Sequence, residues 1–169
     1  MTAIGRWFAM MREPTRRVEP IEPGRHRIQL PDNERAVLGD LGGQLRSLLT
    51  QGTDGPEVRR LFPTAYADDP ERDAEYRDLM SDDLLARRLA TADVLESTAT
   101  ATELDDEQLM AWIGAVNDLR LVLGTRLDVS EEDDLEATDG DPVRGIYLYL
   151  GWLLEHLMDC AQATLPEQH

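Results

Sequence analysis

Residues 103–127 constrain the fold more than any other stretch, because they contain an amphipathic helix with recognisable ends. At its start, Asp105 and Gln108 fit the Asp-x-x-Gln form of the capping box, and Leu104 and Leu109 occupy the hydrophobic-staple positions. Apolar residues recur at steps of three and four along one face, which consists of Leu109, Trp112, Ile113, Val116, Leu119 and Leu123. We therefore predict a central helix against which the other elements pack.

Glycines mark two further features of the predicted helices. Gly124 follows the last apolar residue of the central helix and predicts its C-cap. Gly39, Gly42 and Gly43 instead fall inside the helical pattern of residues 33–50, where each costs roughly 1 kcal/mol relative to alanine. Their small size predicts that another backbone approaches this helix closely.

Four further helices are predicted from apolar periodicity and from start signals, over residues 33–50, 70–80, 82–98 and 142–163. Asp69-Pro70 and Asp141-Pro142 mark two of the starts, because proline is favoured at the first helical position. Ser81 separates the second of these helices from the third. The fold class is therefore mainly α: a compact bundle of about five helices with a small N-terminal β-hairpin-like element.

The N-terminal β element is predicted from two short segments. Residues 5–12 are apolar, and residues 25–30 alternate weakly, which places Ile28 and Leu30 on one face. Three prolines within residues 13–23 argue against a regular element between the two segments. We therefore predict two short strands joined by a long loop.

At 169 residues the chain most simply forms a single domain. Its organisation is predicted as a basic β or irregular segment, a helical part, an acidic loop and an apolar C-terminal helix, over residues 1–30, 31–127, 128–141 and 142–163. The acidic loop holds eight acids in fourteen residues. A calcium-binding EF-hand does not fit it, because counting back from Gly140 puts Leu135 at the first ligand position. We expect a solvated loop.

The charge of the chain is strongly acidic and uneven. It contains 17 basic and 34 acidic residues, for a net charge of -17. Residues 1–30 contain six arginines and three acids, a net of +3, so the remaining residues carry -20. Such a body repels nucleic acid. It suits contacts with basic partner surfaces, but the favoured interpretation is that the acidity only keeps the protein soluble. Direct DNA binding through the arginine-rich N-terminal segment remains an alternative.

Cys160 is the only cysteine, which excludes an intrachain disulfide and a zinc site made of several thiolates. The chain lacks a secretory signal pattern, so we expect a cytoplasmic protein. The longest apolar run, from Ile146 to Leu154, is about half the length of a membrane span, and no membrane contact is predicted.

The first half of the last helix is apolar nearly all round. A helix without a polar face is either central in a bundle or shared between subunits. We therefore expect a homo-oligomer, with self-association through Ile146, Tyr147, Tyr149, Leu150, Trp152 and Leu153.

His156, Asp159 and Cys160 line one side of the last helix at i, i+3 and i+4. They could form a metal site or a base-activated thiolate, as in an enzyme or a metal-binding helical protein. No second histidine or cysteine lies nearby in sequence, which favours a partly buried helix end with ordinary hydrogen bonds. We predict no catalytic residue, no metal ligand and no cofactor, and keep Cys160 as a possible redox residue.

Polar residues interrupt the central helix at Asn117, Asp118 and Arg120, and Arg126 follows. They could bind an anion or a partner, because arginine grips carboxylates in bidentate fashion. The favoured interpretation is a polar network that fixes the register of the helix, since buried polar groups mostly bond within the fold.

The run from Trp112 to Leu127, together with Arg60 to Tyr66 and Tyr147 to Leu153, resembles the actinobacterial family known as domain of unknown function 2017 (DUF2017). The resemblance covers nearly the whole chain. It implies a small cytoplasmic transcriptional regulator of the oxidative-stress response that acts with a stress sigma factor or RNA polymerase and senses oxidant through a cysteine pair. Because Cys160 is alone, an intramolecular disulfide switch cannot operate here. We therefore predict a non-enzymatic regulator that acts through protein contacts.

Overall fold

The computed structural model describes residues 17–53, 55–127 and 142–163 of the chain. Their elements are, in order, β1 (Val18–Glu22), β2 (Arg25–Ile28), α2 (Asp32–Thr50), the 3-10 helix η1 (Pro56–Val58), α3 (Pro70–Thr98), β3 (Glu103–Asp105), α4 (Asp106–Leu127) and α5 (Pro142–Ala163). The predicted class, mainly α with a small β element, is confirmed. The apolar segment 5–12 and the acidic loop 128–141 lie outside the described residues.

The described residues contain four α-helices, whereas the sequence predicted about five. The difference is α3, a single helix of 29 residues that spans both the helix predicted at 70–80 and the one predicted at 82–98. Ser81 does not divide it, because serine costs a helix only about 0.5 kcal/mol and no glycine or proline accompanies it. The predicted start is confirmed: Asp69 caps the helix by accepting from the Arg72 amide at 3.2 Å, and Pro70 is its first residue.

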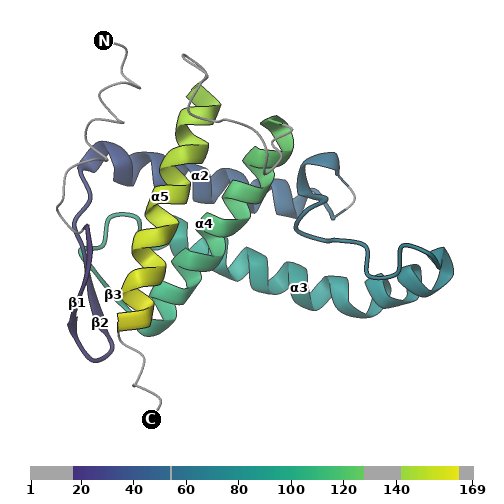
Figure 1. Ribbon diagram of the computed structural model, residues 1–169, viewed down its shortest axis with the longest axis horizontal. Coiled ribbons are helices and arrows are strands. Elements are labelled where there is room, and N and C mark those ends of the chain that lie inside the picture. The colour runs from purple at the N-terminus through teal and green to yellow at the C-terminus, as the bar shows by residue number, and fades with distance from the viewer. Residues whose placement is uncertain (1–16, 54, 128–141, 164–169) are drawn as a thin grey trace.

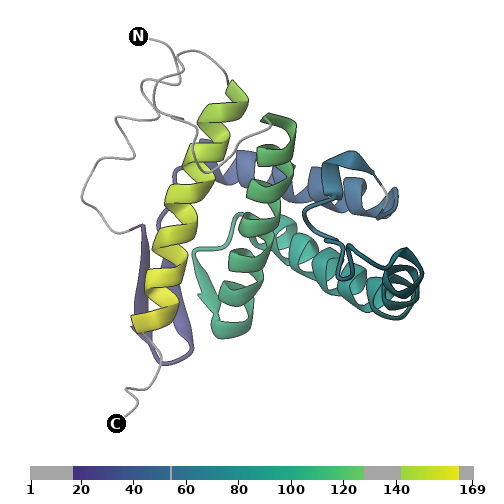
Figure 2. The ribbon, with the colours of Figure 1, turned by 45° about the vertical axis from the view of Figure 1, so that its right-hand side comes forward.

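The helices form two pairs that cross each other (Figures 1 and 2). In one pair α2 packs on α3, and in the other α4 packs on α5. The second pair is antiparallel, since Gly124 of α4 lies beside Tyr147 of α5 and Gly151 of α5 beside Arg120 of α4. None of the described helices has both the length and the apolar content that crossing a membrane would require.

Helix α4 is the central element, as predicted, and it is covered on more than one side. The predicted face is buried except for Ile113, which is half-buried, and the flanking positions Ala111, Ala115 and Val122 are buried as well. The fully buried indole of Trp112 donates through Nε1 to Thr98 Oγ1 at 2.7 Å, which ties α4 to the end of α3. Both neighbouring helices are therefore fixed by the same central element.

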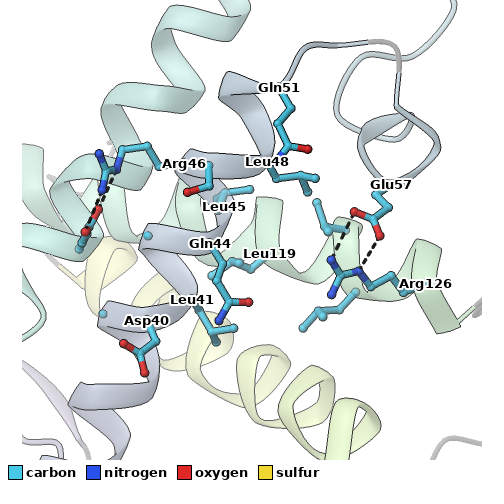
Figure 3. A pocket seen from close by; sticks show the side chains of 16 residues that line it. Asp40, Leu41, Gln44, Leu45, Arg46, Leu48, Gln51, Glu57, Leu119 and Arg126 are labelled. Atoms are coloured by element: carbon cyan, nitrogen blue, oxygen red, sulfur yellow. Dashed lines mark hydrogen bonds and ion pairs between the residues drawn. The ribbon is translucent and has the colours of Figure 1, made fainter.

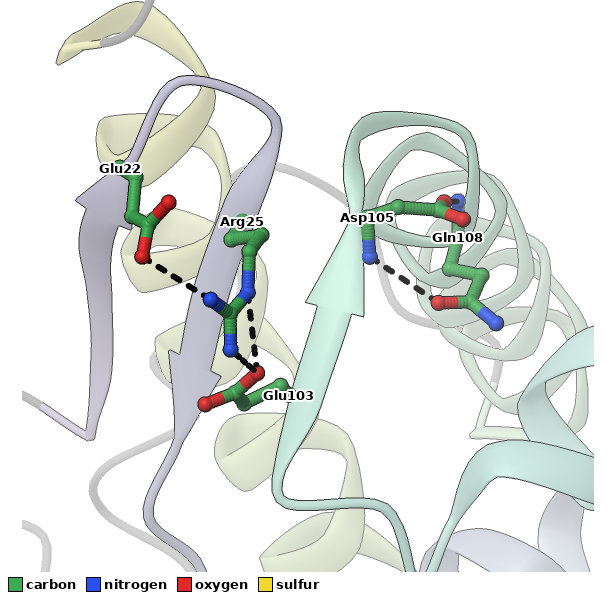
Figure 4. A network of polar contacts seen from close by, with 5 residues as sticks. All are labelled: Glu22, Arg25, Glu103, Asp105 and Gln108. Atoms are coloured by element: carbon green, nitrogen blue, oxygen red, sulfur yellow. Dashed lines mark hydrogen bonds and ion pairs between the residues drawn. The ribbon is translucent and has the colours of Figure 1, made fainter.

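The start of α4 is partly as predicted (Figure 4). The capping box is confirmed: the Gln108 amide donates to Asp105 Oδ1 at 2.7 Å, and the Asp105 amide donates to Gln108 Oε1 at 3.0 Å. Glu103–Asp105 is not helical, however, but forms strand β3. The predicted C-cap is wrong, because α4 continues through Gly124 to Leu127. Gly124 is buried, and its lack of a side chain makes room for Arg60 and Tyr147.

The small sheet is antiparallel, with the strand order β1-β2-β3. The predicted long loop is wrong, because β1 runs through the proline-rich stretch and a tight turn joins it to β2 at Gly24, where φ is +82°. Pro20 fits β1 because this strand lies at the edge of the sheet, and the register shifts between Pro20 and Glu22. On the exposed side, Arg25 of β2 bridges Glu22 of β1 and Glu103 of β3 (Figure 4).

Arg35, in the first turns of α2, joins the sheet to the helices. Its Nε donates to Leu30 O at 2.9 Å and its Nη2 to Ile28 O at 2.8 Å, after the end of β2. Its Nη1 donates to the carbonyls of Ala99 and Ala101, in the turn between α3 and β3. One guanidinium thus satisfies four backbone carbonyls that no ladder or helix bond uses.

The helices α2 and α3 approach most closely at Gly42, as the glycine pattern predicted. A Cβ built on Gly42 would lie 3.0 Å from the Glu96 nitrogen and 3.3 Å from the Ala92 oxygen, both backbone atoms of α3. At Gly39 the corresponding atom would only reach Ala99 Cβ, at 3.4 Å. Backbone atoms cannot move aside as a flexible side chain can, so Gly42 sets the spacing of this pair.

We expect Gly42→Ala to lower the free energy of unfolding by about 1–3 kcal/mol, because the added methyl pushes α3 away from α2. Gly39→Ala is the matched control, and its better helix propensity should leave stability unchanged or raise it by up to about 1 kcal/mol. Urea denaturation followed by circular dichroism measures both. Equal losses in the two variants would contradict the close-approach explanation.

Candidate functional site

The polar residues predicted on the central helix lie in separate environments. Asn117 is exposed, whereas Asp118 is 3% exposed and accepts from Arg88 of α3. Burial raises the pKa of the Asp118 carboxyl, and the neighbouring Arg88 guanidinium opposes that rise without cancelling it. Asp118 and Arg88 therefore join α3 to α4 at the cost of desolvating a charge.

Arg120 lies between α4 and α5. Its guanidinium carbon is 4.9 Å from the centre of the Tyr147 ring, in a cation–π contact. A Cβ on Gly151 would come within 3.2 Å of Arg120 Nε, so this glycine makes room for the guanidinium. Nε is buried and makes no hydrogen bond within the described part of the chain. The planar guanidinium of Arg120 thus packs between α4 and α5.

Arg126 lies at the edge of a groove between α2, α4 and η1, which Figure 3 shows from close by. The groove has a volume of about 630 Å³. Its floor is apolar and its rim is charged, but each rim arginine is paired with a rim glutamate: Arg126 Nε with Glu57 Oε1 at 3.1 Å, and Arg46 Nε with Glu96 Oε2 at 2.9 Å. The groove therefore offers little unpaired charge to a ligand.

The six residues predicted for self-association on α5 separate into two groups. Three have no exposed surface and pack inside this chain: Tyr149, Leu150 and Leu153. The other three are half-buried against the same core: Ile146, Tyr147 and Trp152. Burial against α4 and β1 accounts for much of the apolar character of α5. Self-association stays a prediction, to which the second group can contribute surface.

Cys160 meets a histidine that the sequence did not bring near it. Its Sγ lies 3.3 Å from Nδ1 of His26 in β2, and Nε2 of His26 lies 2.6 Å from Oδ1 of Asp106 at the start of α4. Cys160 is 3% exposed and His26 is fully buried, whereas the Asp106 side chain is 67% exposed. We call these three residues the thiol relay, because they link a buried sulfur through an imidazole to solvent.

The hydrogen-bond roles in the thiol relay follow from the chemistry of its members. A carboxylate only accepts, so Nε2 of His26 carries a proton and donates to Asp106. In the neutral ring Nδ1 is then an acceptor that faces the Cys160 thiol. A thiol next to a base that is oriented by a carboxylate is the arrangement that activates a sulfur nucleophile. Neither the groove beside Arg126 nor a second hollow, beside Phe62 and Tyr76, reaches the relay.

The sequence suggested His156 as a partner of Cys160 only as the less favoured interpretation, and the structure brings His26 to the sulfur instead. His156 packs its ring against Trp152, with 4.4 Å between the ring centres. The strand pattern contained the missing signal: Ile28 and Leu30 face the core, and with a period of two His26 shares that face. A buried histidine needs a partner, but a contact across 134 residues cannot be read from spacing. No group of three His, Cys, Asp or Glu side chains in the described ranges could hold a metal ion.

The comparison with protein families matches residues 14–161 to the family described as "Domain of unknown function (DUF2017)". The chain belongs to the DUF2017 family. Two relatives, both named "Oxidative stress regulator AosR", come from Mycobacterium tuberculosis (strain H37Rv) and Mycobacterium bovis. Each is 28% identical to this DUF2017 chain, over 85% of the chain and 85% of the relative. No solved structure matches the chain.

The raised pKa of Asp118 gives the DUF2017 fold a testable pH dependence. The folded protein holds the Asp118 proton at pH values where the unfolded chain has lost it, so the free energy of unfolding falls as the pH rises through this range. Asp118→Asn carries no titrating group at this position and should gain stability relative to the wild type as the pH rises above about 4, the ordinary pKa of an aspartate. Urea denaturation of both proteins across that range measures the difference. A variant that instead loses relative stability as the pH rises would show that the pairing with Arg88 outweighs burial.

The thiol relay predicts that Asp106 increases the reactivity of Cys160 in this DUF2017 protein. A carboxylate stabilises the imidazolium that forms when His26 takes the thiol proton, and an amide does so less well. Because Asp106 is largely exposed, we expect Asp106→Asn to slow iodoacetamide alkylation of Cys160 by only about threefold. Mass spectrometry follows the reaction, and Glu107→Gln, at the adjacent exposed acid, is the control. Equal rates in all three proteins would remove Asp106 from the relay.

Proposed function

We propose that this protein is a cytoplasmic, non-enzymatic regulator of transcription under oxidative stress, which acts by binding RNA polymerase or a stress sigma factor. The observation that carries the proposal is its membership of DUF2017 together with relatives named as oxidative stress regulators. A regulator of this kind needs a group that responds to oxidant and a surface that meets a partner.

The thiol relay supplies a group that can respond to a small hydroperoxide. The Cys160 proton moves to Nδ1 of His26, and the thiolate sulfur attacks one peroxide oxygen. A sulfur–oxygen bond forms as the oxygen–oxygen bond breaks, and the leaving oxygen takes the proton from His26 and departs as water or an alcohol. The peroxide is reduced and Cys160 becomes a sulfenic acid. This chemistry needs only one cysteine.

Oxidation at this position also has a structural consequence. The contact between Cys160 and His26 joins the last turns of α5 to β2, and both residues are buried. A sulfenic oxygen needs space and a hydrogen-bond partner of its own, so it disturbs this junction. The state of the sulfur is thereby coupled to the packing of α5 against the sheet.

Purification of tagged full-length protein from its native host, with and without hydroperoxide treatment, tests the proposal. We expect subunits of RNA polymerase to be enriched, and their recovery to change by about twofold or more with oxidant. Cys160→Ser should retain the polymerase but lose the response to oxidant. Quantitative mass spectrometry of the retained subunits gives both readings.

Two outcomes would contradict the proposal. Absence of polymerase subunits under both conditions would remove the partner. The alternative of direct DNA binding would be favoured if the purified protein bound duplex DNA with a steep salt dependence and lost this binding when residues 1–16 were removed.

A further inference from the structure

The described residues include five exposed large hydrophobic side chains: Tyr76, Leu79, Met80, Met110 and Met158, with exposed fractions of 42%, 77%, 45%, 57% and 45%. The first three lie on one short stretch of α3, where their spacing at i, i+3 and i+4 places them on one face of the helix. Single exposed apolar residues are ordinary on protein surfaces, whereas a contiguous group marks a contact surface.

A hollow of about 280 Å³ adjoins this apolar stripe. One wall is the segment that leads into α3 and includes Phe62 and Pro63, and the other wall includes Tyr76, Met80 and Leu84. The hollow is lined mainly by apolar side chains and opens toward solvent. A partner side chain can enter it, so the stripe offers a pocket as well as a flat face.

The length of α3 explains why most of this face stays exposed, although the Tyr76 ring packs edge-on against Tyr66 with 5.9 Å between the ring centres. At 29 residues the helix is about 43 Å long. Its contacts with α2 and α4 involve the second half, at Arg88, Thr91, Ala92, Glu96 and Thr98. The first half extends beyond the crossing of the two helix pairs (Figures 1 and 2). It is held from one side only, where Asp73 accepts from the amides of Ala65 and Tyr66.

A row of four carboxylates runs beside the apolar stripe. Glu71, Glu75, Asp78 and Asp82 recur at steps of four, three and four, and all are exposed. None forms an ion pair with another described residue, whereas two of the nearby arginines are engaged: Arg72 stacks on Tyr66, and Arg77 pairs with Asp73. Two of the carboxylate pairs are like charges at i, i+4, each of which costs a helix roughly 0.2–0.5 kcal/mol. A basic partner would relieve this repulsion.

We propose that the first half of α3 is the docking surface for a partner protein, and that the partner presents a basic helix with apolar anchors. We call this surface, made of the apolar stripe Tyr76, Leu79 and Met80 and the acidic row Glu71, Glu75, Asp78 and Asp82, the α3 face. The anchors of the partner pack on the stripe and into the adjoining hollow, and its lysines or arginines meet the acidic row. The inference rests on the proposed function only in taking a protein as the partner.

The charge pattern argues against one other occupant and against one other surface. A second copy of the chain that docked α3 face to α3 face would bring two acidic rows together, which costs binding energy. In the larger groove of Figure 3 both arginines are paired within the chain, Arg126 with Glu57 and Arg46 with Glu96. The α3 face combines three exposed apolar side chains with four carboxylates that have no ion pair among the described residues.

Synthetic peptides test the α3 face with the full-length protein. One is a helical 16-residue peptide with leucines at i, i+3, i+4 and i+7 and lysines on both flanks, and the other carries glutamates in place of the lysines. Fluorescence anisotropy should show that the lysine peptide binds at least about tenfold more tightly, with an affinity that falls between about 50 and 200 mM salt. Equal affinity for the two peptides would overturn the proposal.

Variants of the protein test whether the lysine peptide binds at the α3 face. Leu79→Gln with Met80→Gln, and separately Asp78→Asn with Asp82→Asn, should each weaken binding of the lysine peptide by about tenfold. Met110→Gln on α4 and Asp93→Asn in the second half of α3 change matched exposed residues and should leave the affinity unchanged. All the changes are at exposed positions, and unchanged unfolding curves verify folding. Losses as large in the controls as on the α3 face would overturn the proposal.

The inference about the α3 face and the proposed function can each be contradicted without the other. Peptide binding that maps to the α3 face supports the inference even when no polymerase is retained from the host, and in that case the proposed function fails. Retention of polymerase that is undiminished in the Leu79→Gln, Met80→Gln protein overturns the inference and leaves the proposed function standing.

Discussion

Burial of α4 over more than one face is the constraint on which the rest of the structure depends. A helix that buries Trp112 and also buries Ala111 and Val122, about 100° away around its axis, must be covered by more than one neighbour, and α3 and α5 provide the cover. The indole bond to Thr98 fixes where α3 crosses α4, near the end of α3. Because only the second half of α3 is needed for this crossing, its first half is left to extend from the fold.

Charged groups behave differently inside the fold and on the extended first half of α3. Inside the fold, charged groups are matched to specific partners: Arg35 to four carbonyls, and Arg88 to Asp118. On the extended half of α3, carboxylates stand beside exposed apolar side chains with no ion-pair partner among the described residues. The thiol relay lies at the other end of the molecule, where the last turns of α5 meet the sheet (Figure 2). The group proposed to respond to oxidant and the surface proposed to meet a partner are thus distinct parts of the chain.

The sequence predicted correctly the features that depend on residues within one helical turn. The capping box at Asp105 and Gln108 and the proline start at Pro70 lie within one turn of the groups they satisfy, and both were predicted. Strand β3, by contrast, exists because β2 pairs with it across more than 70 residues, so no strand was predicted before the cap at Asp105. The pairing of Cys160 with His26 is longer in range still, which is why only the histidine on the same helix was considered as its partner. The α3 face was missed although its stripe lies within the helix predicted at 70–80, because whether a neighbour covers a helix face depends on the packing of distant segments.

Hydrogen–deuterium exchange of the full-length protein, alone and bound to RNA polymerase, tests most directly the claim that the protein works through an external face and not through a cleft. The account predicts that backbone amides of residues 70–84 become more slowly exchanging in the complex, while those of the buried α4 stay as slow as in the free protein. Protection confined to the groove between α2 and α4, or to α5, with residues 70–84 unchanged, would contradict it.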